Sequence, residues 1–323
     1  MTDLFLSILG QMVYLFAFIV IGFVISKWKL APDNSATVLS RLENLIFLPA
    51  AVMMTFITDC TVEKIANLWA EILGAFALGL LLIPLSLYFA KLCFKEEYVQ
   101  KIAAYSLAFS NFAYMGLAVM PAVFPEIELE YTIFTLPLWF MIYAWGAPVL
   151  LIGGSNNGEK VSLNKRMKSF VNPMMVGMII GLVLGISGAN AHIPKPITNV
   201  LTAGKNCMSP IAMMLTGMTI AKIDLMALLK KWRIYIISIV KLLVYPLLFI
   251  SIFLFVPKNA FFSDALLKCA FCVMCMPMGL NGIVIPAGYG KDTTDAAGMA
   301  LVTHLLSIVT IPLMFMLFEY CIV

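Results

Sequence analysis

The sequence predicts an all-α membrane protein with ten transmembrane helices, arranged as two inverted repeats of five, in which helices 4 and 9 are broken. Three observations predict this fold. Of the 323 residues, 62% are hydrophobic and only 12% are charged, whereas a soluble domain carries about 25% charged residues. Apolar segments long enough to cross a bilayer follow one another along the chain. Prolines recur at nearly constant offsets between the two halves.

Each predicted span holds about 20 or more mostly apolar residues, which suffices for a hydrocarbon core of about 30 Å. The spans cover residues 4–26, 36–58, 66–90, 99–124, 130–153, 169–188, 196–221, 233–256, 263–289 and 293–320. The first is too long for a signal peptide and shows no cleavage signature, so we expect it to remain as a span. The polar stretch 154–168 is expected to link a first repeat, 1–153, to a second, 169–323.

The proline positions predict the internal repeat. Prolines 49, 84, 121 and 148 in the first half match prolines 210, 246, 286 and 312 in the second, at offsets of 161, 162, 165 and 164 residues. Asn44 precedes the first proline of one series, and Asn206 precedes the first proline of the other. Because five is an odd number of spans, the second repeat must enter the membrane from the opposite side. Such inverted repeats are typical of transporters that work by alternating access.

The basic residues predict the orientation in the membrane. Fourteen Lys and Arg residues fall in loops on one side, against three (Lys64, Lys195 and Lys258) on the other. Cytoplasmic loops carry the excess of positive charge. We therefore expect both termini outside and the 154–168 linker in the cytoplasm, in an inner or plasma membrane. Since the basic residues are scattered over short loops, the net charge of +4 does not indicate a nucleic-acid partner.

Two stretches, Ser110–Pro121 and Cys275–Pro286, interrupt spans 4 and 9. An interior proline removes a backbone donor, so we expect each helix to break at its proline. The half-helix that follows each proline would present unpaired N–H groups to a carboxylate. The candidate substrate-binding residues here are Asn111, Gly116, Pro121, Gly279, Asn281, Gly282 and Pro286.

Ten spans in two inverted fives, a polar loop after the fifth and these two interrupted spans resemble the auxin efflux carrier family. The stretches Asn111–Pro121 and Gly279–Pro286 are the most specific part of the resemblance. The short central loop resembles the bacterial malate or malonate permeases more than the long-looped plant carriers. The resemblance implies broken spans that cross in an X within a mobile transport domain (spans 3–5 and 8–10). Spans 1, 2, 6 and 7 would form a scaffold and a dimer surface. Sodium/bile-acid symporters are more distantly similar.

Ionisable residues inside spans are costly and are therefore functional candidates. Lys205 lies well inside span 7, next to Asn206, and Lys241 lies inside span 8. Together with Arg41, these cations indicate an anionic substrate, and we add Lys205 and Asn206 to the candidate substrate site. The alternative for Lys241 and Arg41 is that their long side chains reach back to the membrane surface.

Coupling to an ion needs a titratable group. His304, near the centre of span 10, can titrate near physiological pH. Glu71 and Lys268 lie near the outer edge of spans 3 and 9, and could form a pair that opens on protonation. The alternatives are a hydrogen-bonded core histidine and a structural ion pair. Because no acidic cluster flanks either break, we rank protons, or no coupling, above sodium, and we expect no other cofactor.

Two small-residue patterns predict packing. Gly177, Gly181 and Gly185 form a doubled GxxxG motif, which indicates a tight helix pair within the scaffold or across a homodimer. Three cysteines, Cys269, Cys272 and Cys275, recur every three residues but lack His or carboxylate partners, so we interpret them as packing residues and expect no metal. The chain carries no GxSxG, P-loop, HExxH or dinucleotide motif, which argues against an enzyme.

The sequence as a whole predicts a secondary transporter of small organic anions, such as malate or malonate, working by elevator-type or rocking movement. Two alternatives remain open: a sodium-coupled symporter of the bile-acid type, and a membrane sensor that keeps the fold without transporting. A sodium requirement would identify the first alternative, and the absence of substrate flux would identify the second.

Overall fold

The computed structural model describes residues 2–60, 62, 68–152, 173–222, 230–257, 261–288 and 291–322. All named elements in this part of the chain are helices, and its one isolated β-bridge joins Ser110 to Met278. The predicted linker, 154–168, lies outside the described residues. The all-α class predicted from hydropathy is therefore confirmed for the described part of the chain.

The first half of the chain contains ten helical segments in the described residues. They are α1 (Thr2–Lys27), α2 (Ser35–Leu42), the π-helical η1 (Glu43–Phe47), α3 (Leu48–Asp59), α5 (Trp69–Cys93), α6 (Glu97–Ala108), α7 (Gly116–Val123), the short η2 (Pro125–Ile127), α8 (Glu128–Met141) and the π-helical η3 (Ile142–Ile152). The α2–η1–α3 run is continuous and corresponds to predicted span 2. Pro84 lies inside α5 without ending it.

The second half continues in the same way after residue 172. Its elements are α10 (Pro173–Ile186), η4 (Ala189–His192), α11 (Lys195–Ile220), α13 (Trp232–Ile239), the π-helical η5 (Val240–Val244), α14 (Tyr245–Phe253), α15 (Asp264–Cys275), α16 (Asn281–Gly288) and α17 (Thr294–Cys321). Ser263 caps α15, since its hydroxyl accepts a hydrogen bond from the Leu266 amide at 3.1 Å.

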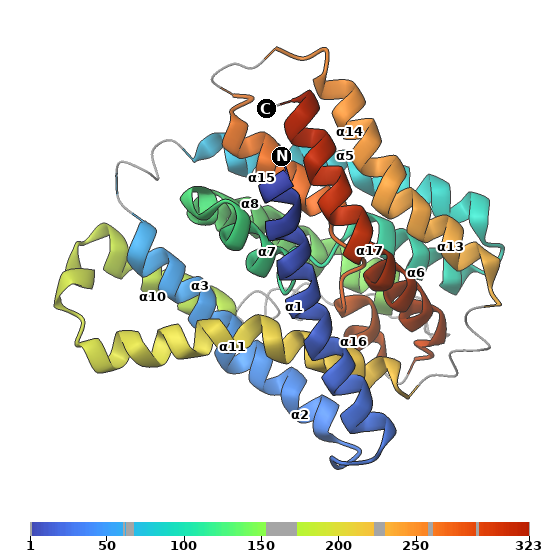
Figure 1. Cartoon of the computed structure of the whole chain (residues 1–323), viewed down its shortest axis with the longest axis horizontal. Coiled ribbons are helices and arrows are strands. Elements are labelled where there is room, and N and C mark those ends of the chain that lie inside the picture. The colour runs from blue at the N-terminus through green and yellow to red at the C-terminus, as the bar shows by residue number, and fades with distance from the viewer. Residues whose placement is uncertain are drawn as a thin grey trace.

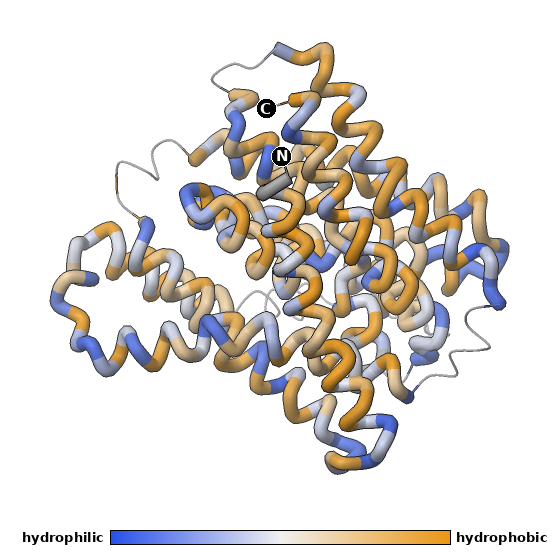
Figure 2. Tube along the Cα trace, viewed as in Figure 1, coloured by the Kyte–Doolittle hydropathy of each residue, from blue (hydrophilic) through white to orange (hydrophobic). Residues whose placement is uncertain are grey.

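Six helical runs among the described residues are long and apolar enough to cross a membrane. They are Phe5–Lys27, Ser35–Asp59, Trp69–Cys93, Pro125–Leu151, Trp232–Phe253 and Thr294–Cys321. Hydrophobic residues predominate along them (Figure 2). Large apolar side chains such as Val20, Leu80 and Val309 are exposed on their outer faces, as expected of surfaces that face lipid.

The helices pack into two groups. In one group, α1 packs along α11, and α3 packs against both α10 and α11. In the other, α5 packs against α6 and α8, while α17 packs against α13 and α6. Figure 1 shows α3, α10 and α11 together at the lower left, and α5, α13, α14 and α17 at the upper right. The groups meet where α1 contacts α7 and α17, and where α3 contacts α8.

The glycine motif of α10 is used within the chain. A Cβ atom added at Gly177 would lie 2.8 Å from the Pro49 carbonyl oxygen, and one at Gly181 would lie 2.6 Å from that of Met53. A Cβ at Gly185 would collide with the carbonyl oxygen of Phe56 in the same way. Small residues here let α10 approach the α3 backbone closely. Of the two partners left open by the motif, the structure shows a helix of the same chain.

The two helix breaks lie upstream of the prolines that were expected to cause them. Pro121 lies inside α7 and Pro286 inside α16, whereas the breaks are residues 109–115 and 276–280. An interior proline removes one hydrogen bond, and a packed membrane helix tolerates this loss. The second break instead follows from Pro277, because the residue before a proline avoids helical angles. Met276 is indeed extended, with φ −65° and ψ 145°, and α15 ends at Cys275.

Candidate functional site

The two breaks lie against each other as a short antiparallel pair. The Asn111 amide donates to the Pro277 carbonyl at 2.7 Å, and the Gly279 amide donates to the Phe109 carbonyl at 3.2 Å. These bonds join segments more than 160 residues apart in the sequence. Backbone groups freed by a helix break need partners when water is excluded. Each break therefore supplies hydrogen-bond partners for backbone groups of the other. We call this pairing of residues 109–111 with 277–279 the crossing.

Two of the predicted site glycines allow close approach at the crossing. A Cβ at Gly279 would lie 2.9 Å from the Ser110 carbonyl oxygen, so only glycine fits without moving backbone. Gly116 begins α7 directly beneath the Tyr131 hydroxyl, which donates to the Phe112 carbonyl at 2.9 Å. Both glycines therefore shape the crossing, and neither is among the residues that line the cavity described below.

Asn111 and His304, predicted for separate roles, contact each other. The Asn111 Nδ2 atom lies 3.2 Å from His304 Nε2, and His304 Nδ1 lies 2.7 Å from the Ala300 carbonyl oxygen. A carbonyl oxygen only accepts, so the imidazole proton sits on Nδ1, and Nε2 accepts from the Asn111 amide. The side chains are 2% and 1% exposed. The geometry matches the hydrogen-bonded core histidine that was the alternative for His304.

Lys241 binds the C-terminal end of α6, the helix that precedes the first break. Its Nζ donates to the Leu107 carbonyl at 3.1 Å, and the residue is 0% exposed. Leu107 lies in the last turn of α6, where unpaired carbonyls give the helix end a partial negative charge that favours a cation. Lys241 thus stabilises the carbonyl end of α6, and its side chain does not reach the membrane surface.

Two of the remaining predicted residues, Asn281 and Gly282 at the start of α16, contact Tyr105 of α6. The Asn281 side chain forms a hydrogen bond with Tyr105. A Cβ at Gly282 would meet the end of Met278 and the ring of Tyr105. Pro286 is buried within α16. These contacts hold the second break in place, and they lie away from the cavity described next.

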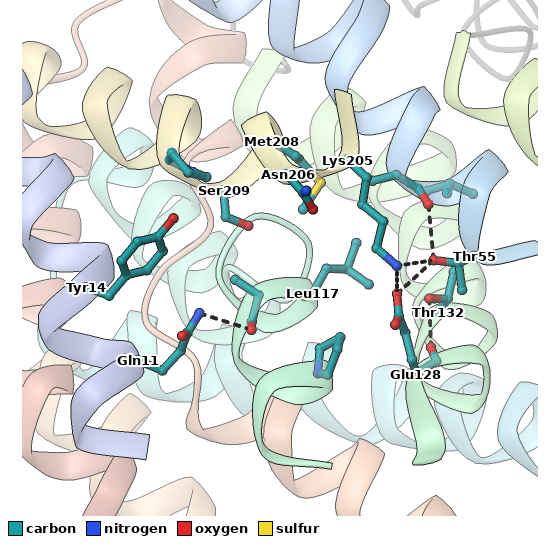
Figure 3. A pocket seen from close by; sticks show the side chains of 15 residues that line it. Gln11, Tyr14, Thr55, Leu117, Glu128, Thr132, Lys205, Asn206, Met208 and Ser209 are labelled. Atoms are coloured by element: carbon teal, nitrogen blue, oxygen red, sulfur yellow. Dashed lines mark hydrogen bonds and ion pairs between the residues drawn. The ribbon is translucent and has the colours of Figure 1, made fainter. Parts of the chain in front are cut away.

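A cavity of about 400 Å³ lies between the two helix groups, and α1, α3, α7, α8 and α11 form its walls. Figure 3 shows Lys205 reaching down from α11 to Glu128 at the start of α8. The two form an ion pair, and Glu128 also accepts a hydrogen bond from Thr55 at 2.9 Å. The lining residues with polar side chains are Gln11, Tyr14, Thr55, Glu128, Thr132, Lys205, Asn206 and Ser209.

The cavity adjoins the crossing through α7 and the segment before it. Leu117, Ala118 and Pro121 of α7 line the cavity, and Gln11 donates to the Ala118 carbonyl at 3.3 Å. Ser209, on the opposite wall, donates to the Tyr114 carbonyl at 3.0 Å. Three predicted site residues therefore lie at this cavity: Pro121, Lys205 and Asn206.

The expected unpaired N–H groups are absent from the first turn of α7. The Gly116 amide donates to the Asn111 carbonyl at 3.1 Å, and the Leu117 amide donates to Ala113 at 3.1 Å. The Val119 amide donates to Met115 at 2.9 Å. These bonds arise because the segment before α7 folds into turns that supply carbonyls to it. An anion in the cavity would therefore be held by side chains in this conformation.

Glu71 and Lys268 do not pair in the structure, although the sequence suggested that they could. The Lys268 Nζ atom lies 3.6 Å from Glu319 Oε1 and 4.2 Å above the ring of Phe124. The Oε2 atom of Glu71 is buried and has no hydrogen-bond partner among the described residues. Glu319, near the end of α17, thus takes the place expected for Glu71.

Sequence reasoning did not identify Glu128 as a partner of Lys205. Glu128 lies between the predicted spans 99–124 and 130–153, yet it begins α8 and points into the cavity. Its place at the first turn of a helix was the available signal, because carboxylates favour that position. No group of three or more His, Cys, Asp or Glu residues is placed to hold a metal ion in the part of the chain that the structure describes.

Comparison with known proteins adds one match. A family model described as "Membrane transport protein" matches residues 7–315. This range includes both breaks, the crossing and every residue that lines the cavity. A search of curated proteins finds no match.

Proposed function

Because the chain belongs to the auxin efflux carrier family of membrane transport proteins, we propose that it is a secondary transporter of small organic anions. Mono- and dicarboxylates, such as malate or malonate, are the proposed substrate class. The family consists of transporters and not of enzymes, and the chain is a multi-pass membrane protein.

The proposed topology has ten spans. The six long apolar runs are joined by four further spans: α10, α11 and the two broken pairs, α6 with α7 and α15 with α16. The halves 1–153 and 169–323 form inverted repeats around a cytoplasmic 154–168 linker, with both termini outside. In support, the breaks fall at matching places in the two halves, and each carries its proline in the half-helix that follows.

The main support for this function is the cavity beside α7, the half-helix that follows the first break. Its volume, about 400 Å³, lies at the small end of the range for ligand pockets. Among the described residues that line it, Lys205 carries the one positive charge and Glu128 the one negative charge. A substrate carboxylate can replace Glu128 as the partner of Lys205, while Asn206, Ser209 and Tyr14 supply neutral hydrogen bonds.

We assign the transport movement to a displacement of one helix group relative to the other. One wall of the cavity comes from α1, α3 and α11, which we assign to the scaffold (spans 1, 2, 6 and 7). The other comes from α7 and α8, which we assign to the transport domain (spans 3–5 and 8–10). Because a sliding transport domain would carry one wall past the other, the cavity would open to each side in turn. A homodimer through the scaffold, with a proton as coupling ion, completes the proposal.

A thermal-shift screen of the purified protein tests the substrate class. The screen compares malate, malonate and succinate, with and without sodium and at two pH values, in the wild type, Lys205→Met and the control Lys91→Met. Lys91 is exposed in the last turn of α5, away from the cavity. A ligand at 100 times its Kd stabilises the folded state by about 2.7 kcal/mol.

We expect a carboxylate to raise the apparent Tm of the wild type and of Lys91→Met, and to leave that of Lys205→Met unchanged. No shift with any carboxylate, or an equal shift in all three proteins, would argue against an anion site at Lys205.

A further inference from the structure

Glu43 is a buried carboxyl group in the middle of the α2–η1–α3 run. It is 1% exposed, and neither carboxyl oxygen has a hydrogen-bond partner among the described residues. It begins the π-helical segment η1, and such segments inside α-helices occur frequently at functional sites. A packing role would be served better by an apolar side chain, so the carboxyl group calls for another explanation.

The charged groups on neighbouring elements do not neutralise Glu43. The elements packed against η1 are α2, α3, α10 and α11. Their titratable or charged residues, within the described residues, are Arg41 on α2, Asp59 on α3, and Lys195, Lys205 and Cys207 on α11. None of these forms an ion pair with Glu43 within 4.0 Å. Tyr114, which lies outside these elements, is within electrostatic range of Glu43 and carries no positive charge that could neutralise it.

Burial without a partner requires Glu43 to be neutral in this conformation. An ionised carboxylate removed from water, with neither a cation nor a donor, is strongly unfavourable, and the group takes up a proton instead. The conformation seen here is therefore available only to the protonated form of Glu43.

The position of Glu43 mirrors that of Lys205. Glu43 and Asn44 precede Lys205 and Asn206 by 162 residues, within the range of offsets that relates the prolines. In inverted repeats, equivalent residues exchange surroundings when the transporter changes from one conformation to the other. Lys205 and Asn206 line the open cavity here. Glu43 and Asn44 should accordingly line the cavity of the opposite conformation.

Tyr114, in the segment between α6 and α7, covers this second pair. Its hydroxyl donates to the Asn44 side chain at 3.2 Å, and its carbonyl accepts from Ser209. Tyr114 moves with α7 in the proposed transport domain, whereas Asn44 and Ser209 belong to the scaffold. Displacement of the domain would break both bonds and would expose Glu43 to water.

We propose that Glu43 is a proton-controlled release group for the anionic substrate. The proposal rests on the function proposed above. In the opposite conformation, Glu43 gives its proton to water in the cavity and becomes a carboxylate. The new negative charge repels the bound anion toward that side. Glu43 must take a proton back from the same water before Tyr114 can cover it again, so each return of the transport domain needs one proton.

Equilibrium exchange of radiolabelled malonate in proteoliposomes tests this role. The pH is set equal on both sides and raised from about 7 to about 8.5, where both malonate carboxyl groups are already ionised. Because one proton limits the return step, the wild-type exchange rate should fall by up to about tenfold per pH unit. Glu43→Gln, which resembles the protonated form, should exchange malonate at a rate independent of pH. Glu97→Gln, an exposed carboxylate paired with Lys101, is the matched control.

A measurement without substrate separates this proposal from the proposed function. Hydrogen–deuterium exchange of residues 110–116, corrected for intrinsic amide rates, should increase with pH in the wild type and in Glu97→Gln, but not in Glu43→Gln. Tyr114→Phe should show faster exchange at every pH and should keep the pH dependence, since Glu43 is intact.

The outcomes are distinct. If the wild type does not exchange malonate, the proposed function fails for this substrate, and the hydrogen-exchange result still decides the role of Glu43. If Glu43→Gln shows the same pH dependence as the wild type in hydrogen exchange, the release role is overturned. An unchanged malonate pH profile in that variant overturns it equally.

Discussion

The crossing depends on the absence of a side chain at Gly279, and replacing this residue by alanine measures how much. The added Cβ would lie 2.9 Å from the Ser110 carbonyl oxygen, about 0.5 Å inside van der Waals contact. The neighbouring atoms are backbone atoms, including the Phe109 carbonyl oxygen at 3.2 Å. Neither segment can therefore relieve the contact by rotating a side chain, and the two must separate.

The cost has two parts. Overpacking of a filled site costs about 1–3 kcal/mol. Separation also weakens the Asn111–Pro277 and Gly279–Phe109 bonds, each of which contributes about 0.5–1.5 kcal/mol. Since the two parts overlap, we expect a loss of about 2–4 kcal/mol. For a chain of this length, at about 2 °C per kcal/mol, the apparent Tm should fall by about 4–8 °C.

Thermal unfolding in detergent, followed by tryptophan fluorescence, measures this change. Gly10→Ala is the control, because a Cβ at Gly10 has no atom within 4 Å, and helix propensity makes that change neutral or slightly stabilising. Gly282→Ala should fall between the two, since its Cβ meets the flexible end of Met278. If Gly279→Ala unfolds at the same temperature as Gly10→Ala, the tight crossing is not a determinant of stability.

Three further predictions concern charge and packing. Lys241→Met leaves the carbonyl end of α6 without its cation, and the apparent Tm should fall by an amount matching about 1–3 kcal/mol; an unchanged Tm would contradict the role given to this contact. Glu128→Gln frees Lys205 from its partner, so a carboxylate should bind more tightly in a thermal-shift titration, and weaker binding would contradict competition between Glu128 and substrate. Gly181→Val forces α10 away from α3 and should abolish a folded monodisperse peak in size-exclusion chromatography, whereas normal elution would refute the close packing.

The spans and the packing glycines could be predicted from sequence because both rest on local patterns. Hydropathy identified the α2–η1–α3 run as one span despite its π-helical segment and its proline. The spacing of Gly181 with its neighbours predicted a close helix pair, although only the fold shows that α3 is the partner. The breaks were placed several residues too late. Their position depends on Pro277 and on bonds between residues 109–111 and 277–279, which no local pattern reveals.

The site was less predictable, because its contacts join distant parts of the chain. Lys205 was recognised as a cation inside a predicted span, but its partner Glu128 is 77 residues away and fell between two predicted spans. Asn111 and His304 were each recognised, while their contact across 193 residues was not. The Glu71–Lys268 pair was wrong because Glu319, from the far end of the chain, lies nearer to Lys268. Residue type thus identified candidates, and tertiary packing decided their partners.

Solute counterflow in proteoliposomes tests the central claim most directly. Vesicles loaded with unlabelled malonate or malate are diluted into trace labelled anion, for the wild type, Lys205→Met and the control Lys91→Met, whose side chain is exposed away from the cavity. We predict transient accumulation of label with the wild type and the control, and none with Lys205→Met, provided that it elutes as folded protein. Accumulation by Lys205→Met equal to that of the wild type, or by none of the three, would contradict transport of carboxylates through the cavity beside the crossing.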